Sequence, residues 1–301
     1  MKIVELSGGV GGARLARGLA SLPDVDLTIV VNVGDDDENH GFHVSPDLDT
    51  VVYTLAGLEG PEGWGRAGDT FEFNDELGRF GVDNTFRLGD RDLALKTFRT
   101  LQMRRGSALS EVTGRVAGAF GITTLVLPVT DDVLRTRVRI AEEWVSFQEY
   151  FVGRGHRDEV MELEFDGAGL ARPAPGVLES IATADMVVIG PSNPPLSIQP
   201  ILEVAGVRAA VAAHPRVTAV SPLIGGKTIK GPADRVMASL GFPPGNRGVA
   251  AAYEGLIDRL VIDRSDIGDV ELIDGPRVEA TDTLIKDRAA SARLAKELIR
   301  N

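Results

Sequence analysis

Short continuous apolar runs recur along the chain, each followed by a loop rich in glycine, proline or serine. The first two, Lys2–Leu6 and Leu27–Val33, enclose a glycine-rich segment and an expected helix from Ala13 to about Ser21. Unbroken apolar strands suit a parallel sheet covered on both faces, because neither face then meets water. The start of the chain therefore predicts a strand–loop–helix–strand unit.

The same alternation of apolar runs and loops continues later, with one long interruption. Residues 51–120 show helical periodicity and few strand signals, which predicts a helical insertion covering the edge of the sheet. Residues 1–50 and 121–301 then form a Rossmann-like nucleotide-binding core. The fold class expected is α/β, with a doubly wound, mostly parallel sheet and a helical insertion. The remaining expected elements are strands at Ile122–Pro128, Met186–Gly190 and Val217–Val220, an antiparallel excursion at Val138–Trp144 and Glu159–Phe165, and helices at Asp92–Met103, Leu109–Ala119 and Leu284–Ile299.

Composition narrows the class of protein. Hydrophobic residues make up 43% and charged residues 25% of the 301 residues, which is typical of a globular enzyme. The absence of cysteine excludes disulfides, thiolate zinc sites and a cysteine nucleophile. No apolar run approaches the ~18–20 residues of a membrane span, and the start of the chain lacks the pattern of a signal peptide. We therefore expect a cytoplasmic protein that does not associate with membranes.

The net charge of −12 disfavours a nucleic-acid partner, because such proteins are usually basic. It also constrains a small phosphate ligand, which an acidic protein repels at long range. Backbone N–H groups, a few arginines or a divalent metal would have to offset that repulsion.

The first candidate site is the glycine loop between the first strand and the first helix. Gly8, Gly9, Gly11 and Gly12 let the backbone approach a ligand and direct N–H groups at a phosphate. The loop lacks the Gly-Lys-Ser/Thr of a Walker loop, and Asn32 closes the second strand where a dinucleotide fingerprint has an acid. We expect these glycines and Asn32 to bind a nucleotide; the alternative is a tight structural turn.

An acidic loop follows the second strand, at the carboxyl edge of the sheet where ligands bind in such folds. Clustered carboxylates without a neighbouring Lys or Arg favour magnesium. Asp47 and Asp49 flank one apolar residue and so do not share a helix face. The alternative is a solvated loop in which Asp47 caps a helix beginning near Leu48. The acids of this loop are Asp35, Asp36, Asp37, Glu38, Asp47 and Asp49.

Leu88–Asp92 opens the predicted helix that runs to Met103. Asp90 is the expected N-cap. Arg91 lies in the first turn, where the helix dipole favours anions, so it suggests a carboxylate or phosphate partner. The alternative is a surface ion pair with Asp90 or Asp92.

Two later loops also follow strands. Prolines stiffen the segment that carries Ser192 and Asn193, which favours a binding role over a rigid connector. Lys227 or Lys230 could bind an anion, but we expect both to be solvated lysines of a surface turn. The four histidines lack metal-binding spacing, and His156 and His214 are expected at the surface.

Taken together, these motifs resemble the 2-phospho-L-lactate transferase (CofD) family over essentially the whole chain. The most specific are the Pro-Asp-Leu-Asp and Leu-Gly-Asp-Arg-Asp sequences. The motifs occur in the family's order and spacing: Gly8–Gly12, Asn32–Asp36, Ser45–Thr50, Leu88–Asp92, Phe147–Glu149, Gly190–Pro194 and Ser221–Ile224.

The resemblance implies a magnesium-dependent step in the synthesis of coenzyme F-420. A guanosine-diphosphate-activated phospho-acid, 2-phospho-L-lactate or phosphoenolpyruvate, would be transferred to the terminal ribityl hydroxyl of 7,8-didemethyl-8-hydroxy-5-deazariboflavin, releasing GMP. It implies a metal site at Asp35 and Asp49, deazaflavin contacts for Asp49, Arg91 and Asp90, and a catalytic role for Asp49. It also implies nucleotide contacts for the glycine loop, Ser192 and Asn193, and a homodimer. Aromatic residues of the insertion would cover the acceptor or, alternatively, belong to the core: Trp64, Phe71, Phe73, Phe80 and Phe86.

Two other functions are compatible with parts of the pattern. One is a nucleotide-sugar-binding regulatory protein of the related gluconeogenesis-factor branch, which shares the glycine loop and fold but not the two acidic motifs. The other is a nicotinamide-linked oxidoreductase, which the glycine spacing and the missing acid disfavour.

Overall fold

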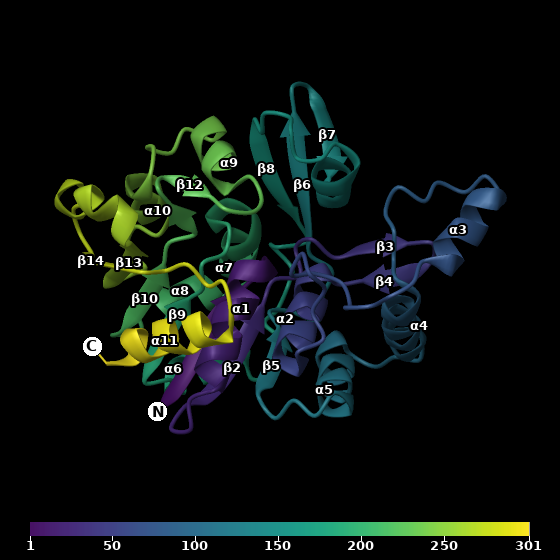
Figure 1. The fold of residues 1–301 in the computed structure, drawn as a ribbon, viewed down its shortest axis with the longest axis horizontal. Helices are drawn as coiled ribbons and strands as arrows, with labels where there is room; N and C mark the ends of the chain where they lie inside the picture. The colour runs from purple at the N-terminus through teal and green to yellow at the C-terminus, as the bar shows by residue number, and fades with distance from the viewer. Residues whose placement is uncertain (301) are drawn as a thin grey trace.

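A seven-stranded parallel sheet forms the centre of the protein in the computed structural model, which describes residues 1–300 (Figure 1). Its strands lie in the order β14-β13-β10-β9-β1-β2-β5. They are β1 (Lys2–Ser7), β2 (Asp26–Val31), β5 (Leu125–Pro128), β9 (Met186–Ile189), β10 (Val217–Val220), β13 (Arg259–Asp263) and β14 (Arg277–Thr281).

The direction of winding reverses between β1 and β9. From β1 the chain steps to β2 and β5, and it later returns to β9 on the other side of β1 before stepping outward to β14. In the register of the sheet Leu6 pairs with both Val30 and Ile189, so the three strands end at one level. Ligands of doubly wound folds bind in the crevice at such a reversal, and the glycine loop and the Ser192 loop are the two loops beside it.

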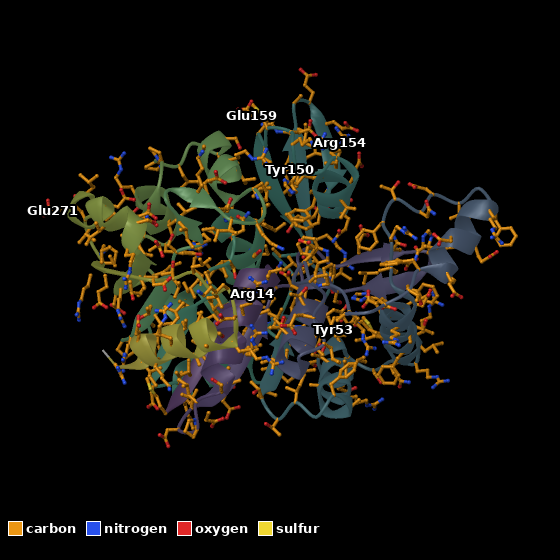
Figure 2. All side chains as sticks on the ribbon, in the orientation of Figure 1. Arg14, Tyr53, Tyr150, Arg154, Glu159 and Glu271 are labelled. Carbon is orange, nitrogen blue, oxygen red and sulfur yellow. The ribbon has the colours of Figure 1, made fainter. Side chains whose placement is uncertain are left out.

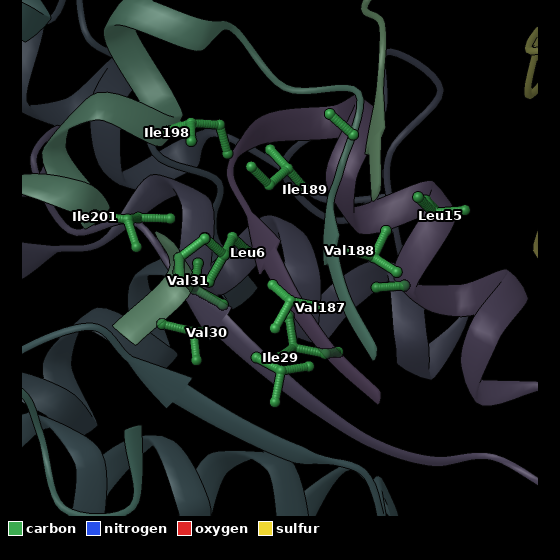
Figure 3. Close-up of a cluster of buried hydrophobic side chains, with 14 of the residues drawn as sticks. Leu6, Leu15, Ile29, Val30, Val31, Val187, Val188, Ile189, Ile198 and Ile201 are labelled. Carbon is green, nitrogen blue, oxygen red and sulfur yellow. The ribbon is translucent and has the colours of Figure 1, made fainter. Parts of the chain in front are cut away.

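Because parallel crossovers are right-handed, the reversal places helices on both faces. One face carries α1 (Gly9–Ala20), which packs against α2 (Pro46–Ala56) and α11 (Arg288–Ile299), with α5 (Leu109–Ala119) beside β5. The other face carries α8 (Val207–Ala212), which contacts α6 (Val177–Thr183) and α7 (Gln199–Glu203). Figure 3 shows side chains of β1, β2 and β9 packed between Leu15 of α1 and Ile201 of α7.

One residue of the central strand departs from this apolar core. Glu5 is completely buried in β1, and neither of its carboxylate oxygens has a hydrogen-bond partner. Burial raises the pKa of Glu5 well above its usual range. The first strand, expected to be apolar, therefore carries an acid whose neutral form the core favours.

Two smaller units extend from the core (Figure 1). An antiparallel sheet, in the order β7-β6-β8, rises above it. A hairpin that precedes the insertion and two helices of the insertion project to the right of the core in Figure 1. The antiparallel sheet consists of β6 (Arg135–Ile140), β7 (Glu143–Ser146) and β8 (Glu162–Asp166); the projecting part consists of β3 (Asp37–Asn39), β4 (Phe42–Val44), α3 (Glu72–Arg79) and α4 (Asp90–Arg104).

The remaining elements are short and lie mainly in the C-terminal half of the chain. None of the helices in residues 1–300 is long and apolar enough to cross a membrane. These short elements are the π-helical turns η1 (Glu149–Gly153) and η2 (Pro194–Ile198), the hairpin of β11 (Leu223–Ile224) and β12 (Lys227–Thr228), the helices α9 (Ala233–Ser239) and α10 (Asn246–Ala252), and the 3₁₀ segment η3 (Arg264–Leu272).

The expected fold class is confirmed, with four local corrections. The first helix begins at Gly9 rather than Ala13. The strands β13 and β14 were not anticipated, because charged residues interrupt their apolar pattern. His214 is buried rather than exposed: its Nδ1 accepts from the Arg216 N–H at 3.1 Å, and its Nε2 lies 3.1 Å from the Ala184 carbonyl oxygen. The division into a core and an insertion at residues 51–120 stays a prediction.

Candidate functional site

The glycine loop interlocks with the loop that follows β9. The Gly8 N–H donates to Ser192 Oγ at 3.1 Å, and the same hydroxyl donates to the Gly8 carbonyl at 2.7 Å. A Cβ on Gly11 would lie 2.1 Å from the Pro191 carbonyl oxygen, and one on Gly12 would lie 2.3 Å from Ser7 Oγ. Gly11, Gly12 and Ser192 thus hold two loops of the protein together, which is the structural role weighed above.

Asn193 caps the turn that follows it. Its Oδ1 accepts from the Leu196 N–H at 3.2 Å, while its amide nitrogen has no partner among residues 1–300. This leaves one donor of the Asn193 side chain at the reversal point of the sheet. Its expected contact with a nucleotide stays a prediction.

Asp47 reaches from α2 to the start of α1. Its Oδ1 accepts from the Gly9 N–H at 2.7 Å and its Oδ2 from Asn32 Nδ2 at 3.0 Å. Asn32 Nδ2 also donates to Asp35 Oδ1 at 3.3 Å, so this amide bridges two carboxylates. The expectation that Asp47 caps its own helix is wrong: α2 begins at Pro46 after Ser45, and Asp47 instead binds the N-terminus of α1.

Three carboxylates gather around Asn32. Asp35, Asp36 and Asp47 are 5%, 2% and 6% exposed. Burial, followed by the negative charges of Asp47 and Asp36, raises the pKa of Asp35 well above its usual range. Burial likewise raises the pKa of Asp47 to about 6, although hydrogen bonds from Asn32 and Gly9 oppose the shift. Removing several carboxylates from water together in this way disfavours their charged forms, and a divalent cation would reverse that.

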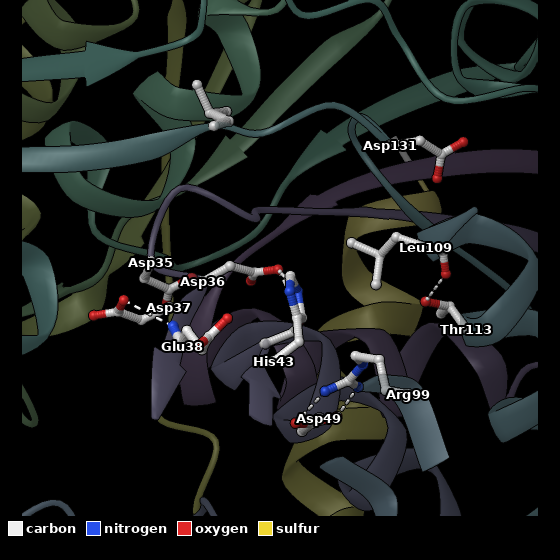
Figure 4. Close-up of polar contacts among 12 residues, drawn as sticks. Asp35, Asp36, Asp37, Glu38, His43, Asp49, Arg99, Leu109, Thr113 and Asp131 are labelled. Atoms are coloured by element: carbon white, nitrogen blue, oxygen red, sulfur yellow. Dashed lines mark hydrogen bonds and ion pairs between the residues drawn. The ribbon is translucent and has the colours of Figure 1, made fainter. Parts of the chain in front are cut away.

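Asp36 is held at the edge of this group. Its Oδ2 accepts from Ser45 Oγ at 2.7 Å and lies 2.9 Å from His43 Nε2, whereas its Oδ1 is buried without a partner. Figure 4 shows Asp36 and His43 turned toward one another beside Asp35. A cleft of about 200 Å³ adjoins these acids and also reaches Arg135 and Gln148.

Asp49 has a different environment, although only Leu48 separates it from Asp47. Arg99 Nη1 donates to Asp49 Oδ2 at 3.1 Å and Nη2 donates to Oδ1, a two-pronged contact visible in Figure 4. Lys96 Nζ lies 2.8 Å from the same Oδ2. Burial alone would raise the pKa of Asp49, but Arg99 and Lys96 outweigh it and lower the pKa. The expected metal pair of Asp35 and Asp49 is therefore divided: Asp35 faces other acids, whereas Asp49 faces cations.

Asp90 and Arg91 lie near the N-termini of α3 and α4, each of which is capped by an acidic side chain from outside the helix. Asp90 accepts from the backbone N–H groups of Glu72 and Phe73, both at 3.0 Å, so it caps α3. Asp69 accepts from the N–H groups of Arg91 and Asp92 and so caps α4. The expectation that Asp90 caps its own helix is therefore wrong: the residue before α4 is Gly89, and the cap comes from Asp69.

The guanidinium of Arg91 is free to bind a ligand. It forms no ion pair with Asp90, Asp92 or any other acid of residues 1–300, and the residue is exposed. The alternative of a surface ion pair is therefore wrong.

A loop of the insertion, residues 58–67, lies over the start of α1. A Cβ on Gly63 would lie 2.5 Å from a methyl carbon of Val10. Lys230 reaches this loop from the other half of the chain: its Nζ lies 2.8 Å from Glu62 Oε2 and 5.2 Å from the centre of the Trp64 ring. Lys230 is therefore more than a solvated lysine of a turn, because it forms an exposed ion pair with an acid of the insertion.

The aromatic residues of the insertion divide into two groups. Trp64, Phe71 and Phe80 are 53%, 39% and 78% exposed, so the core alternative is wrong for them. Phe73 and Phe86 pack against a small buried cluster around Leu88. The exposed group leaves flat apolar surface near the projecting helices.

Sequence reasoning missed several residues of the site. Lys96 and Arg99 had one available signal: Lys96 follows Asp92 by four residues on the same helix face. Asp69 offered none, since its partners, the N–H groups of Arg91 and Asp92, lie in another element.

Known proteins match this sequence over nearly its whole length. The family model described as 2-phospho-L-lactate transferase CofD matches residues 3–300. The chain is 43% identical to a 2-phospho-L-lactate transferase of Methanopyrus kandleri, with 100% of this chain and 97% of that protein covered. It is 41% identical to a phosphoenolpyruvate transferase of Streptomyces griseus, with 99% and 98% covered.

Solved structures give the fold alone. A crystal structure of a UPF0052-family protein from Bacillus halodurans superimposes with a TM-score of 0.68 over 99% of both chains, at 16% identity. At that identity the likeness supports the doubly wound architecture and carries no argument about the ligand.

Proposed function

Because the chain belongs to the CofD family of 2-phospho-L-lactate transferases, we propose that it transfers a phospho-acid to a deazaflavin acceptor. The donor is a guanosine diphosphate carrying 2-phospho-L-lactate or phosphoenolpyruvate. The acceptor is the terminal ribityl hydroxyl of 7,8-didemethyl-8-hydroxy-5-deazariboflavin, and GMP is the leaving group. The reaction is a step of coenzyme F-420 synthesis in the cytoplasm, carried out by a homodimer.

One observation supports this proposal above the others: loops from three strands meet at the reversal point of the sheet. Asp47 joins the glycine loop to Asn32, and Asn32 joins Asp47 to Asp35, all through hydrogen bonds of 2.7 to 3.3 Å. The arrangement puts backbone donors and a set of acids side by side, which is what binding of a diphosphate with a cation requires.

A magnesium ion would fit at Asp35, Asp36 and Asp47 better than at Asp49. The unpartnered Asp36 Oδ1 and the raised pKa of Asp35 both mark acids that a cation would stabilise. No three acidic or histidine side chains among residues 1–300 converge closely enough to enclose a metal by themselves. Ligand phosphates and water would therefore complete the coordination, as is usual for magnesium. When bound, the ion neutralises charge on the diphosphate.

The protein residues position the two substrates for in-line displacement. The acceptor hydroxyl forms a bond to the phosphorus that bears the acid, the bond from that phosphorus to GMP breaks, and the hydroxyl proton leaves to solvent or to a nearby carboxylate. Arg99 and Lys96 keep Asp49 ionised, which suits orienting the hydroxyl by accepting its hydrogen bond better than removing its proton. Arg91 contributes an unpaired guanidinium for the acceptor or its developing charge.

The direct test is an assay with the deazaflavin, a guanylylated donor and magnesium, read by product mass. Asp49→Asn should abolish transfer, but it also leaves the buried Arg99 without its acid and so needs a companion. Arg91→Gln is that companion, since the Arg91 side chain has no partner whose loss would disturb the fold.

We expect Arg91→Gln to lower kcat/KM at least about 100-fold, a loss of about 2.7 kcal/mol of transition-state stabilisation. Arg172→Gln, an arginine whose side chain is 86% exposed, should match the wild type. Normal transfer by Arg91→Gln would remove Arg91 from the proposal. If the wild type neither transfers nor shifts the visible absorption of the deazaflavin, the proposed function is wrong and a nucleotide-binding regulator is favoured.

A further inference from the structure

A closed network of charges joins α2 to α4 beneath the proposed acceptor site. Its five members are 1% to 7% exposed, although four of them carry charge. The network contains two acids, two bases and one phenol: Asp49, Asp92, Lys96, Arg99 and Tyr53. Burying four charges is unfavourable unless each meets opposite charge and good hydrogen bonds.

Each charged member meets opposite charge through the others, although Arg99 Nε is buried without a hydrogen-bond partner. Arg99 grips both oxygens of Asp49, and Lys96 lies between Asp49 and Asp92. The Tyr53 hydroxyl donates to Asp92 Oδ1 at 2.6 Å. Figure 2 labels Tyr53 in the part of the molecule that carries α2 and α5. The formal charges cancel, so the network holds its geometry without a ligand.

The network also links the two residues expected to contact the acceptor. Asp49 lies on α2, whereas Arg91 precedes Asp92 on α4, and the network is the polar contact between those two helices. Asp69 fixes the same end of α4 by accepting from the N–H groups of Arg91 and Asp92. The position of Arg91 relative to Asp49 therefore depends on Lys96 and Arg99.

We propose that Lys96 and Arg99 are positioning residues of the acceptor site, which hold the Asp49 carboxylate in one orientation and set the distance between Asp49 and Arg91. This inference rests on the proposed function for the identity of the acceptor. Neither residue hydrogen-bonds to the donor site around Asn32. The charge of Asp36 acts on Arg99, so the larger effect, rather than the whole effect, should fall on the acceptor.

Measuring the KM of each substrate distinguishes an effect on the position of the acceptor from a general loss of stability. In Arg99→Gln we expect the KM of the deazaflavin to rise at least about tenfold, while the KM of the donor changes less than about twofold. Arg99→Lys keeps the charge but loses the planar fork, so it should recover only part of the acceptor affinity. Tyr53→Phe removes one hydrogen bond and keeps the packing, and should give a smaller rise of the same kind.

Arg259 provides a matched control. It too is a buried arginine, 8% exposed, whose Nε donates to Glu279 at 3.0 Å, but it begins β13 at the opposite end of the sheet from the site. Arg259→Gln should lower the melting temperature and leave both Michaelis constants unchanged.

Two results would overturn the inference in a wild type that is active. One is an acceptor KM within about twofold of the wild type in folded Arg99→Gln. The other is an equal rise in both Michaelis constants. If Arg99→Gln does not fold, Lys96→Arg and Tyr53→Phe decide by the same two constants. An inactive wild type, by contrast, refutes the proposed function and not the network.

Discussion

The buried carboxylate of Glu5 leads to a quantitative prediction of how the free energy of unfolding depends on pH. Its carboxylate is completely buried in the central strand and has no hydrogen-bond partner. A Cβ on Gly190 would lie 2.8 Å from Glu5 Oε1, so the loop after β9 closes over the acid and excludes water. Nothing in this environment compensates a negative charge.

The sign follows from the direction of the pKa shift. Burial raises the pKa of Glu5 in the folded protein, whereas in the unfolded chain the acid titrates in its ordinary range. Between those two pKa values the folded state binds more protons than the unfolded state, so the free energy of unfolding falls as pH rises. A single group changes it by about 1.4 kcal/mol per pH unit across that window.

Glu5→Gln removes this dependence and keeps the shape of the side chain. The free energy of unfolding of the variant, relative to the wild type, should therefore grow by up to about 1.4 kcal/mol for each pH unit above the ordinary glutamate pKa. Urea denaturation at pH 5, 6 and 7 measures it through the midpoints and their common slope. Glu164→Gln, an exposed glutamate of β8, is the control.

If Glu5→Gln and the wild type lose stability in parallel over this pH range, the prediction is wrong. That outcome would mean that the acid finds a partner, such as an internal water, that the neighbouring side chains do not provide.

Three further predictions concern the glycine loop and the acids. Gly11→Ala should destabilise the protein by more than about 2 kcal/mol in thermal melts, because the added Cβ would collide with the Pro191 carbonyl. As a control, Gly114→Ala on α5 adds a methyl group where the space is open, and it should stabilise the protein by about 0.5–1 kcal/mol. Asp35→Asn should raise the melting temperature of the ligand-free protein, because it removes the repulsion between Asp35 and the acids Asp36 and Asp47. The same variant should abolish the magnesium dependence of GDP binding in calorimetry. A lower melting temperature than that of the wild type would contradict this. Lys230→Gln should change the unfolding free energy by less than about 1 kcal/mol, as expected for an exposed pair, and a larger change would show that the contact with Glu62 holds the two halves together.

The sheet could be predicted from the sequence wherever its strands are buried on both faces. The apolar runs at Lys2–Leu6, Met186–Gly190 and Val217–Val220 became β1, β9 and β10 within one or two residues. β13 begins with Arg259, whose charge is neutralised by Glu279 on β14. That cross-strand pair is invisible to a reading of either segment alone, so both strands were missed.

The site could be predicted as a set of motifs but not as a set of contacts. The spacing of Asp47 and Asp49 correctly indicated that they face different ways, because a helix turns about 100° per residue. It could not indicate that Asp47 binds Gly9 or that Asp49 binds Arg99, which lie 38 and 50 residues away along the chain. Likewise Asp69 and Asp90 are both sensible caps, and only the packing of α3 beside α4 decides that each caps the other's helix.

The contact between Asp47 and the Gly9 N–H has a consequence for selectivity. The N-terminus of α1 already holds an anion supplied by the protein, at 2.7 Å. A free inorganic phosphate must displace this tethered carboxylate, whose effective concentration is on the order of millimolar or higher. A nucleotide that arrives with its own metal ion has no such competition, since Asp47 can then turn to the ion. We expect the enzyme to tolerate cellular phosphate without inhibition, and inhibition of the wild type by millimolar phosphate would contradict that.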